Sequence, residues 1–170
     1  EEITDTVFEI ASKGFGALIA VERAIDLKPF VETGVHVDAD FSKELVLTIF
    51  QPKTVLHDGG LVLRNDRIVA AACILPLTQR EDLDRNLGLR HRAALGLCEE
   101  SDAVTIVVSE ETGQVSICHG GNLERNLSVD KFRDLLSQLL LHNDDQRNSS
   151  PQLETKTRVS SSRELPVVPH

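Results

Sequence analysis

The pattern of apolar and polar positions switches along the chain between the spacing of strands and that of helices. Continuous apolar runs such as residues 17–21 are typical of strands that are covered on both faces of a sheet. Asn65-Asp66 stands between two further runs and predicts a β-hairpin turn. The expected strands are residues 17–21, 61–63, 67–73, 103–108 and 114–118.

Helical spacing recurs in the segments between these strands. Ser42 and Ser128 stand just before two such segments and are good N-caps. The charged residues of the connection after residue 21, among them Glu22, Arg23 and Glu32, are assigned mostly to the surface. The expected helices are residues 3–13, 43–50, 90–100 and 128–141, and residues 78–86 are expected to form a charged loop.

Size and composition limit the domain organisation. A chain of 170 residues with 41% hydrophobic residues can bury one domain core. Aliphatic residues become sparse after His142, so the remaining sequence has too little apolar surface to offset the entropy of ordering. We therefore expect a folded domain at 1–142 and a disordered tail at 143–170.

Charge and cysteine content exclude several classes of function. The formal net charge of −9 argues against nucleic-acid binding, which a basic surface drives. Cys73, Cys98 and Cys118 are too few and too far apart for a zinc motif, and are expected as buried, reduced thiols of a cytosolic protein. No apolar run has the length of a membrane span. The sequence contains no methionine, which indicates a fragment and leaves a membrane segment upstream open.

Arg90-His91-Arg92 is the first of three clusters of candidate functional residues, and lies in the first turn of an expected helix. Basic residues there oppose the helix dipole, whose N-terminus is already partly positive. They are useful if an anion binds at that end, because free backbone N–H groups and guanidinium groups both bind phosphate. The alternative, of about equal weight, is a solvated patch that forms salt bridges with Asp82 or Asp84.

The second cluster is His57-Asp58-Gly59-Gly60. Asp58 can coordinate a divalent cation or act as the base for a hydroxyl group, and His57 is a candidate metal ligand beside it. An ordinary Asp-Gly turn is the alternative, and these residues alone favour it.

The third cluster, Ser109-Glu110-Glu111-Thr112-Gly113, follows an expected buried strand, where ligand-binding groups are common. Its carboxylates could bind a metal or accept a hydrogen bond from a substrate. A solvated hairpin tip is the equal alternative.

Taken together and in this order, the clusters resemble the diadenylate cyclase domain family. The segments that carry the resemblance are residues 16–19, 22–23, 33–34, 56–59, 71–77, 90–96 and 109–113, and it extends over about residues 3–140. The paired Asp58-Gly59 and Arg90-His91-Arg92 motifs are specific in combination. The sequence is most similar to the membrane-anchored bacterial class, in which a cytoplasmic catalytic domain follows membrane helices.

The resemblance implies that two ATP molecules are condensed into cyclic di-AMP with release of two pyrophosphates. It implies Mg²⁺, Mn²⁺ or Co²⁺ as cofactor and a face-to-face homodimer in which each 3′-hydroxyl attacks the other nucleotide. It implies no nucleic-acid partner, and membrane contact only through segments that are absent from this chain. The corresponding fold is an α/β (α+β) domain, with a central mixed sheet of about six or seven strands, helices on both sides and the site at one sheet edge.

The same resemblance assigns roles to individual residues. Asp58 would orient or deprotonate the 3′-hydroxyl, Gly59 would admit the ribose, and Leu75 would offer backbone groups to adenine. The expected catalytic residues are Asp58, Gly59, Arg90, His91 and Arg92; the expected ATP-binding residues are Gly60, Leu75, Leu89, Arg90, His91, Arg92, Ser109 and Glu110; and the expected metal ligands are His57, Asp58 and Glu110.

Three positions depart from the family pattern. Gly60 replaces the usual alanine, an exchange expected to be nearly silent, and Ile74 replaces an aromatic residue beside the adenine. Leu89 replaces the Thr or Ser that contacts phosphate, which removes a hydrogen bond to a charged group worth about 1.5–3 kcal/mol. These departures keep alternative hypotheses open: a nucleotide-binding regulatory domain of the same fold that is weakly active or inactive, or an interaction protein that binds no nucleotide.

Overall fold

A seven-stranded mixed sheet forms the centre of the protein in the computed structural model, which describes residues 1–147. The strand order is β2-β4-β3-β1-β5-β6-β7. The strands are β1 (Ala17–Val21), β2 (Val35–Asp40), β3 (Gly60–Arg64), β4 (Arg67–Cys73), β5 (Val104–Val108), β6 (Val115–His119) and β7 (Asn122–Glu124). The mixed sheet and its expected size are confirmed.

β1 is the central strand, as its continuous apolar sequence predicts. It pairs in parallel with β3 and antiparallel with β5, with Ala17 opposite Val108 and Val21 opposite Val104. Residues of β1 point alternately to the two faces of the sheet, so that Ala17 and Ile19 lie in one hydrophobic core and Leu18 and Ala20 in the other.

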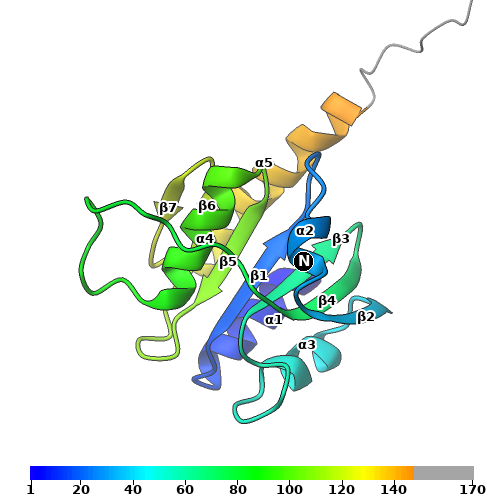
Figure 1. Cartoon of the computed structure of the whole chain (residues 1–170). Coiled ribbons are helices and arrows are strands. Elements are labelled where there is room, and N and C mark those ends of the chain that lie inside the picture. The colour runs from blue at the N-terminus through cyan, green and yellow to red at the C-terminus, as the bar shows by residue number, and fades with distance from the viewer. Residues whose placement is uncertain (148–170) are drawn as a thin grey trace, which may run out of the picture.

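Helices cover both faces of the sheet, as Figure 1 shows. One core packs α1 (Glu2–Ser12), α3 (Lys43–Phe50) and α5 (Val129–Arg147) against the sheet. The other packs the short α2 (Lys28–Val31) and α4 (Leu89–Glu100) against the opposite face. Ser42 caps α3 as predicted, because its hydroxyl accepts the Leu45 N–H at 3.3 Å. All three cysteines are free and buried.

Three short elements lie where only loops and turns were expected. β2 is an edge strand with mostly exposed residues, so it lacks the apolar pattern that marks the inner strands. β7 is the other edge, and α2 has a single turn that begins beside Pro29. The last helix ends at Arg147 and not near Leu141. The first residues of the predicted tail, 143–147, are thus helical, and the rest of it lies outside the described part of the chain.

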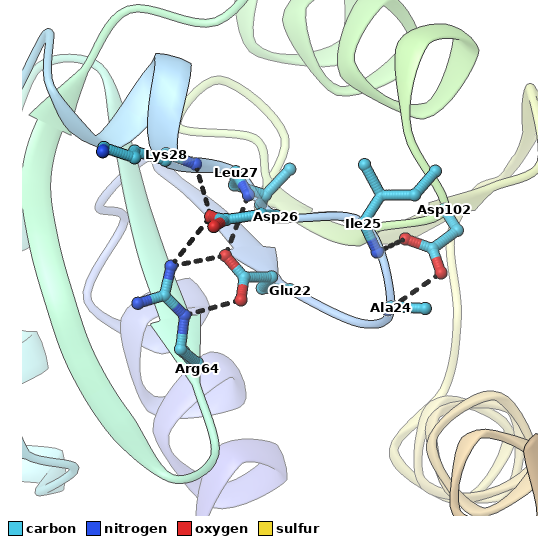
Figure 2. A network of polar contacts seen from close by, with 8 residues as sticks. All are labelled: Glu22, Ala24, Ile25, Asp26, Leu27, Lys28, Arg64 and Asp102. Atoms are coloured by element: carbon cyan, nitrogen blue, oxygen red, sulfur yellow. Dashed lines mark hydrogen bonds and ion pairs between the residues drawn. The ribbon is translucent and has the colours of Figure 1, made fainter. Parts of the chain in front are cut away.

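The connection after β1 is tied to the fold by two carboxylates, which Figure 2 shows. Glu22 was expected at the surface, but its side chain is only 7% exposed. It binds the guanidinium of Arg64 through two contacts of 2.6 and 2.8 Å and accepts the Leu27 N–H at 2.9 Å. Asp102, just before β5, accepts the N–H groups of Ala24 and Ile25, both at 3.0 Å. The loop that leads into α2 is therefore held at both ends.

Candidate functional site

The three clusters meet at one end of the central strands. β3 runs parallel to β1 and β5 antiparallel to it, so the starts of β1 and β3 lie beside the end of β5. Gly60 pairs with Cys73, which brings the end of β4 to the same place. The segments that hold Asp58, Leu75 and Ser109 therefore lie side by side. The site lies across the ends of inner strands, and not along an outermost strand of the sheet.

An apolar cavity of about 360 Å³ opens at this end of the sheet. Its size suits a small planar ligand, and most of its lining is aliphatic. Its lining residues, which define the apolar cavity below, are Leu18, Asp58, Gly59, Ala72, Cys73, Ile74, Leu75, Leu77, Leu89, Arg90 and Ala93.

The backbone around Asp58 is tightly packed on the end of β4. Gly59 has φ +88°, and a Cβ placed on it would come within 2.8 Å of the Cys73 carbonyl oxygen. Ala72, opposite, also has a positive φ of 53° and lies where β4 carries one residue more than β3. A non-glycine residue in this conformation is uncommon and costs free energy, so the bulge is held by its surroundings. Only glycine permits so close an approach beside Asp58.

Ile74 and Leu75 form one wall of the apolar cavity, and contacts with α2 and β3 hold this wall in position. The Ile74 N–H donates to Thr33 Oγ1 at 2.8 Å, and Thr33 in turn donates to the Phe30 carbonyl oxygen at 2.6 Å. A Cβ on Gly60 would lie 2.9 Å from Cδ1 of Leu75. Leu75 therefore occupies the space that an alanine at position 60 would need. The exchange of alanine for Gly60, which was expected to be nearly silent, is thus coupled to the packing of the cavity wall.

A polar cavity of about 300 Å³ lies beside the apolar one and shares Leu89 and Arg90 with it. It is bounded by the N-terminus of α4 and the β5–β6 turn, with charged side chains of both signs. Its lining residues are Asn86, Gly88, Leu89, Arg90, His91, Ser109, Glu110, Glu111, Thr112, Gln114 and Arg125.

Arg90 connects the two cavities. Its Nη1 donates to Glu110 Oε2 at 3.2 Å, which joins α4 to the turn after β5. The guanidinium lies against the start of β1, because a Cβ built on Gly16 would be 2.6 Å from Arg90 Cζ. The salt bridges of the alternative interpretation, from the Arg90-His91-Arg92 cluster to Asp82 or Asp84, are not the ones observed. Asp82 pairs with Arg80 instead, and Asp84 with Arg125.

His91 is buried and lies between charged neighbours. Burial is the main cause that lowers the pKa of His91, and the positive charges of Arg125 and Arg90 lower it further. The imidazole is therefore neutral at neutral pH and can still donate one hydrogen bond. Arg92 points elsewhere: its Nε donates to the Leu87 carbonyl oxygen at 3.3 Å, and it is not among the residues that line the two cavities.

The expected metal ligands are only partly gathered. Within the described residues, no three His, Cys, Asp or Glu side chains are close enough to hold a metal ion. The Nδ1 of His57 lies 2.7 Å from the Thr54 carbonyl oxygen. A carbonyl only accepts, so Nδ1 carries the proton and Nε2 keeps the lone pair that a metal needs.

Most of the predicted site residues thus lie in one continuous pair of cavities. Asp58, Gly59, Leu75, Leu89 and Arg90 line the apolar cavity, and Leu89, Arg90, His91, Ser109 and Glu110 line the polar one. Sequence reasoning missed Ala72, Thr33 and Arg125. Thr33 and Ala72 lie in segments that carry the family resemblance, but no role was expected of them, and Arg125 lies in no such segment. The fold places Ala72 and Arg125 in the cavity walls and joins Thr33 to Ile74 by a hydrogen bond.

The chain was compared with known proteins. The family model described as "DisA bacterial checkpoint controller nucleotide-binding" (DAC) matches residues 4–123. The Cyclic di-AMP synthase CdaA of Bacillus subtilis is 43% identical over 136 residues, which are 80% of this chain and 50% of that protein. The chain spans about half the length of the first curated relatives it matches.

Solved structures show the same relationship. DacA from Staphylococcus aureus, a double mutant, is 40% identical with a TM-score of 0.79, over 81% of this chain and 91% of that one. A structure described as the hypothetical membrane spanning protein from Bacillus cereus is 43% identical with a TM-score of 0.72, over 75% and 62% of the two chains. The helices described in this chain include none that is long and apolar enough to cross a membrane. The family model, the identities and the shared fold agree, and the chain belongs to the diadenylate cyclase (DAC) domain family.

Proposed function

We propose that the protein is a diadenylate cyclase, which condenses two ATP molecules into cyclic di-AMP and releases two pyrophosphates. The observation that carries this proposal is the pair of joined cavities: an aliphatic one with Asp58 at its wall and a polar one with Arg90 and His91. A nucleotide has the same division, with a flat base and ribose at one end and phosphates at the other. The similarity to proteins named cyclic di-AMP synthase and diadenylate cyclase supports this reaction.

Adenine occupies the apolar cavity in this proposal. The backbone of Leu75 faces the base, and the Thr33 hydrogen bond to Ile74 fixes the course of that backbone. Gly59 and Gly60 let the ribose approach β3, which brings the 3′-hydroxyl to the Asp58 carboxylate. Asp58 is exposed, so its carboxylate is free to orient the hydroxyl or to take its proton.

The triphosphate extends into the polar cavity. The free backbone N–H groups at the start of α4 and the guanidinium of Arg90 bind the phosphate oxygens. Neutral His91 donates a further hydrogen bond, and Ser109 offers a hydroxyl. In the reaction, the bond from the 3′-oxygen to the α-phosphorus of the other nucleotide forms as the bond to pyrophosphate breaks, and these groups stabilise the departing charge.

A divalent cation, Mg²⁺ or Mn²⁺ and also Co²⁺, fits this site. Mg²⁺ is usually held by one or two carboxylates together with substrate phosphates, so a complete cage of protein ligands is not required. The candidate ligands are Asp58, His57 through Nε2, and Glu110. Because these three side chains are not gathered around one point, one or two of them would hold the cation together with substrate phosphates. When bound, the cation would neutralise phosphate charge and polarise the α-phosphate.

Two copies of the chain must face each other for the ring to close, since each domain holds one ATP and each 3′-hydroxyl attacks the other nucleotide. We also propose that the longer protein places this domain on the cytoplasmic side of a membrane, which the description of the Bacillus cereus structure supports.

The decisive experiment is incubation of the purified chain with ATP and Mn²⁺, followed by chromatographic separation of the nucleotides. Cyclic di-AMP and pyrophosphate should appear in a ratio of one to two. Asp58→Asn should retain ATP binding and lose product, because the amide cannot take the proton. ATP binding without product in the unaltered chain would identify a nucleotide-binding domain instead of an enzyme. The absence of any thermal shift with ATP would point to an interaction protein.

A further inference from the structure

Arg125 is a second arginine at the polar cavity, and the proposed function has not used it. It follows β7 and lies just beyond residues 4–123, the part of the chain that the family model matches. Its side chain lines the polar cavity together with Arg90 and His91. The positive charges of Arg125 and Arg90 also contribute to the lowered pKa of His91.

Each of the two arginines that line the polar cavity is paired with a carboxylate. Arg90 is paired with Glu110 at 3.2 Å, and Arg125 with Asp84 at 3.3 Å. The carboxylates of both pairs are half exposed or more. Ion pairs of this kind contribute little free energy, because water and salt screen them. A phosphate group can therefore replace either carboxylate at small cost.

We propose that Arg125 binds the β- and γ-phosphates of the nucleotide, and the pyrophosphate formed from them, from the side of the polar cavity opposite Arg90. This inference rests on the proposed function and extends it by a residue of the pyrophosphate site. Two guanidinium groups suit pyrophosphate, because its charge is spread over two phosphorus centres and guanidinium binds phosphate in a bidentate manner. Asp84 holds Arg125 in place until the phosphates arrive.

The chain offers a matched control for this role. Arg80 belongs to the same loop region as Asp84, its side chain is 41% exposed, and it pairs with Asp82 at 2.9 Å. Arg125 is equally exposed at 41% and also pairs with an aspartate. Arg80 is not among the residues that line the polar cavity. The two arginines differ in whether they line the polar cavity, and Arg80 also donates to the Gly121 carbonyl oxygen at 3.0 Å.

The test is calorimetric titration of the unaltered chain, Arg125→Gln and Arg80→Gln with inorganic pyrophosphate and, separately, with adenosine. Arg125→Gln should weaken pyrophosphate binding about tenfold, which is the loss of a hydrogen bond between charged groups. Its affinity for adenosine should not change. Arg80→Gln should bind both ligands as the unaltered chain does. Equal pyrophosphate affinities for the two variants would overturn the proposal.

Asp84→Asn provides a second measurement. Asparagine can still accept the Asn86 N–H, which Asp84 Oδ1 accepts at 2.9 Å, but it no longer pairs with Arg125 by charge. Pyrophosphate should bind more tightly to this variant, and the gain should vanish when Arg125→Gln is added. A gain that persists in the double variant would also overturn the proposal. Because the titrations require no turnover, they test Arg125 even if the chain forms no cyclic di-AMP. Normal cyclase activity with equal pyrophosphate affinities would remove only the role of Arg125.

Discussion

Leu89 stands at the position where the family resemblance predicts a Thr or Ser that contacts phosphate. Its side chain is 71% exposed and lines both cavities, at the first residue of α4. An aliphatic group there offers phosphate no hydrogen bond, although the adjacent backbone N–H groups do. The departure therefore concerns one donor within the proposed phosphate site, whose lining includes Arg90, His91 and the N-terminus of α4.

Restoring the hydroxyl should increase activity. Leu89→Thr adds one hydrogen bond to a charged group, worth about 1.5 kcal/mol or more, and should raise kcat/KM about tenfold. Leu89→Val is the matched control, because valine has the shape of threonine without its hydroxyl. Both variants should unfold at nearly the same temperature as the unaltered chain, since the position is exposed. A threonine variant no faster than the valine variant would show that Leu89 is not the limiting feature.

At the scale of elements, the start of β1 determines where Arg90 of α4 lies. A Cβ on Gly16 would be 2.6 Å from both Cζ and Nη1 of the Arg90 guanidinium. The clash involves the end of a flexible side chain, so the guanidinium can move while the backbone of β1 remains in place. Gly96 of the same helix differs, because its Cβ would be 1.9 Å from the Pro76 carbonyl oxygen. Gly16 is therefore a positioning residue, and Gly96 a packing residue.

Gly16→Ala should leave stability almost unchanged and reduce activity. The displaced guanidinium would leave its place beside Glu110 and no longer reach the phosphates. The value of kcat/KM should then fall roughly tenfold, as expected for loss of one charged hydrogen bond to the substrate. The measurement is a double-mutant cycle with Arg90→Gln: if Gly16 acts through Arg90, the double variant should be no slower than Arg90→Gln alone. Additive losses would assign Gly16 a different role. Gly96→Ala, by contrast, should lower the free energy of unfolding by about 1–3 kcal/mol, as for other overpacked positions.

Elements with a strong internal pattern could be predicted from the sequence, and those defined by their neighbours could not. β1 and α3 were predicted with their observed bounds, because an apolar run and a capped helical pattern each identify them locally. β2 was missed because it is an edge strand that buries little. The same distinction applies to the site. Asp58 and Arg90 belong to motifs to which a role could be assigned, whereas the hydrogen bond between Thr33 and Ile74 and the place of Arg125 in the polar cavity follow only from the fold.

At the scale of the whole molecule, three exposed aliphatic side chains lie together at the apolar cavity. Ile74 and Leu89 are each 71% exposed and Leu77 is 47% exposed, and all three line that cavity. Exposed aliphatic groups around a binding site favour contact with a ligand or a second protein surface. In the proposed reaction both are present, because the second nucleotide arrives on the face of a second chain. The site of one chain is then half of the active site.

A mixing experiment tests this requirement. At saturating ATP, an excess of the Asp58→Asn chain should suppress the activity of a fixed amount of unaltered chain, because mixed dimers hold one hydroxyl that cannot react and cannot close the ring. The same excess of unaltered chain should raise the total rate. Below the dissociation constant of the dimer, the rate should rise with the square of enzyme concentration, since the active species forms from two chains. Constant activity per chain at concentrations where sedimentation detects only monomer would contradict a shared site, and so would indifference to the excess of Asp58→Asn.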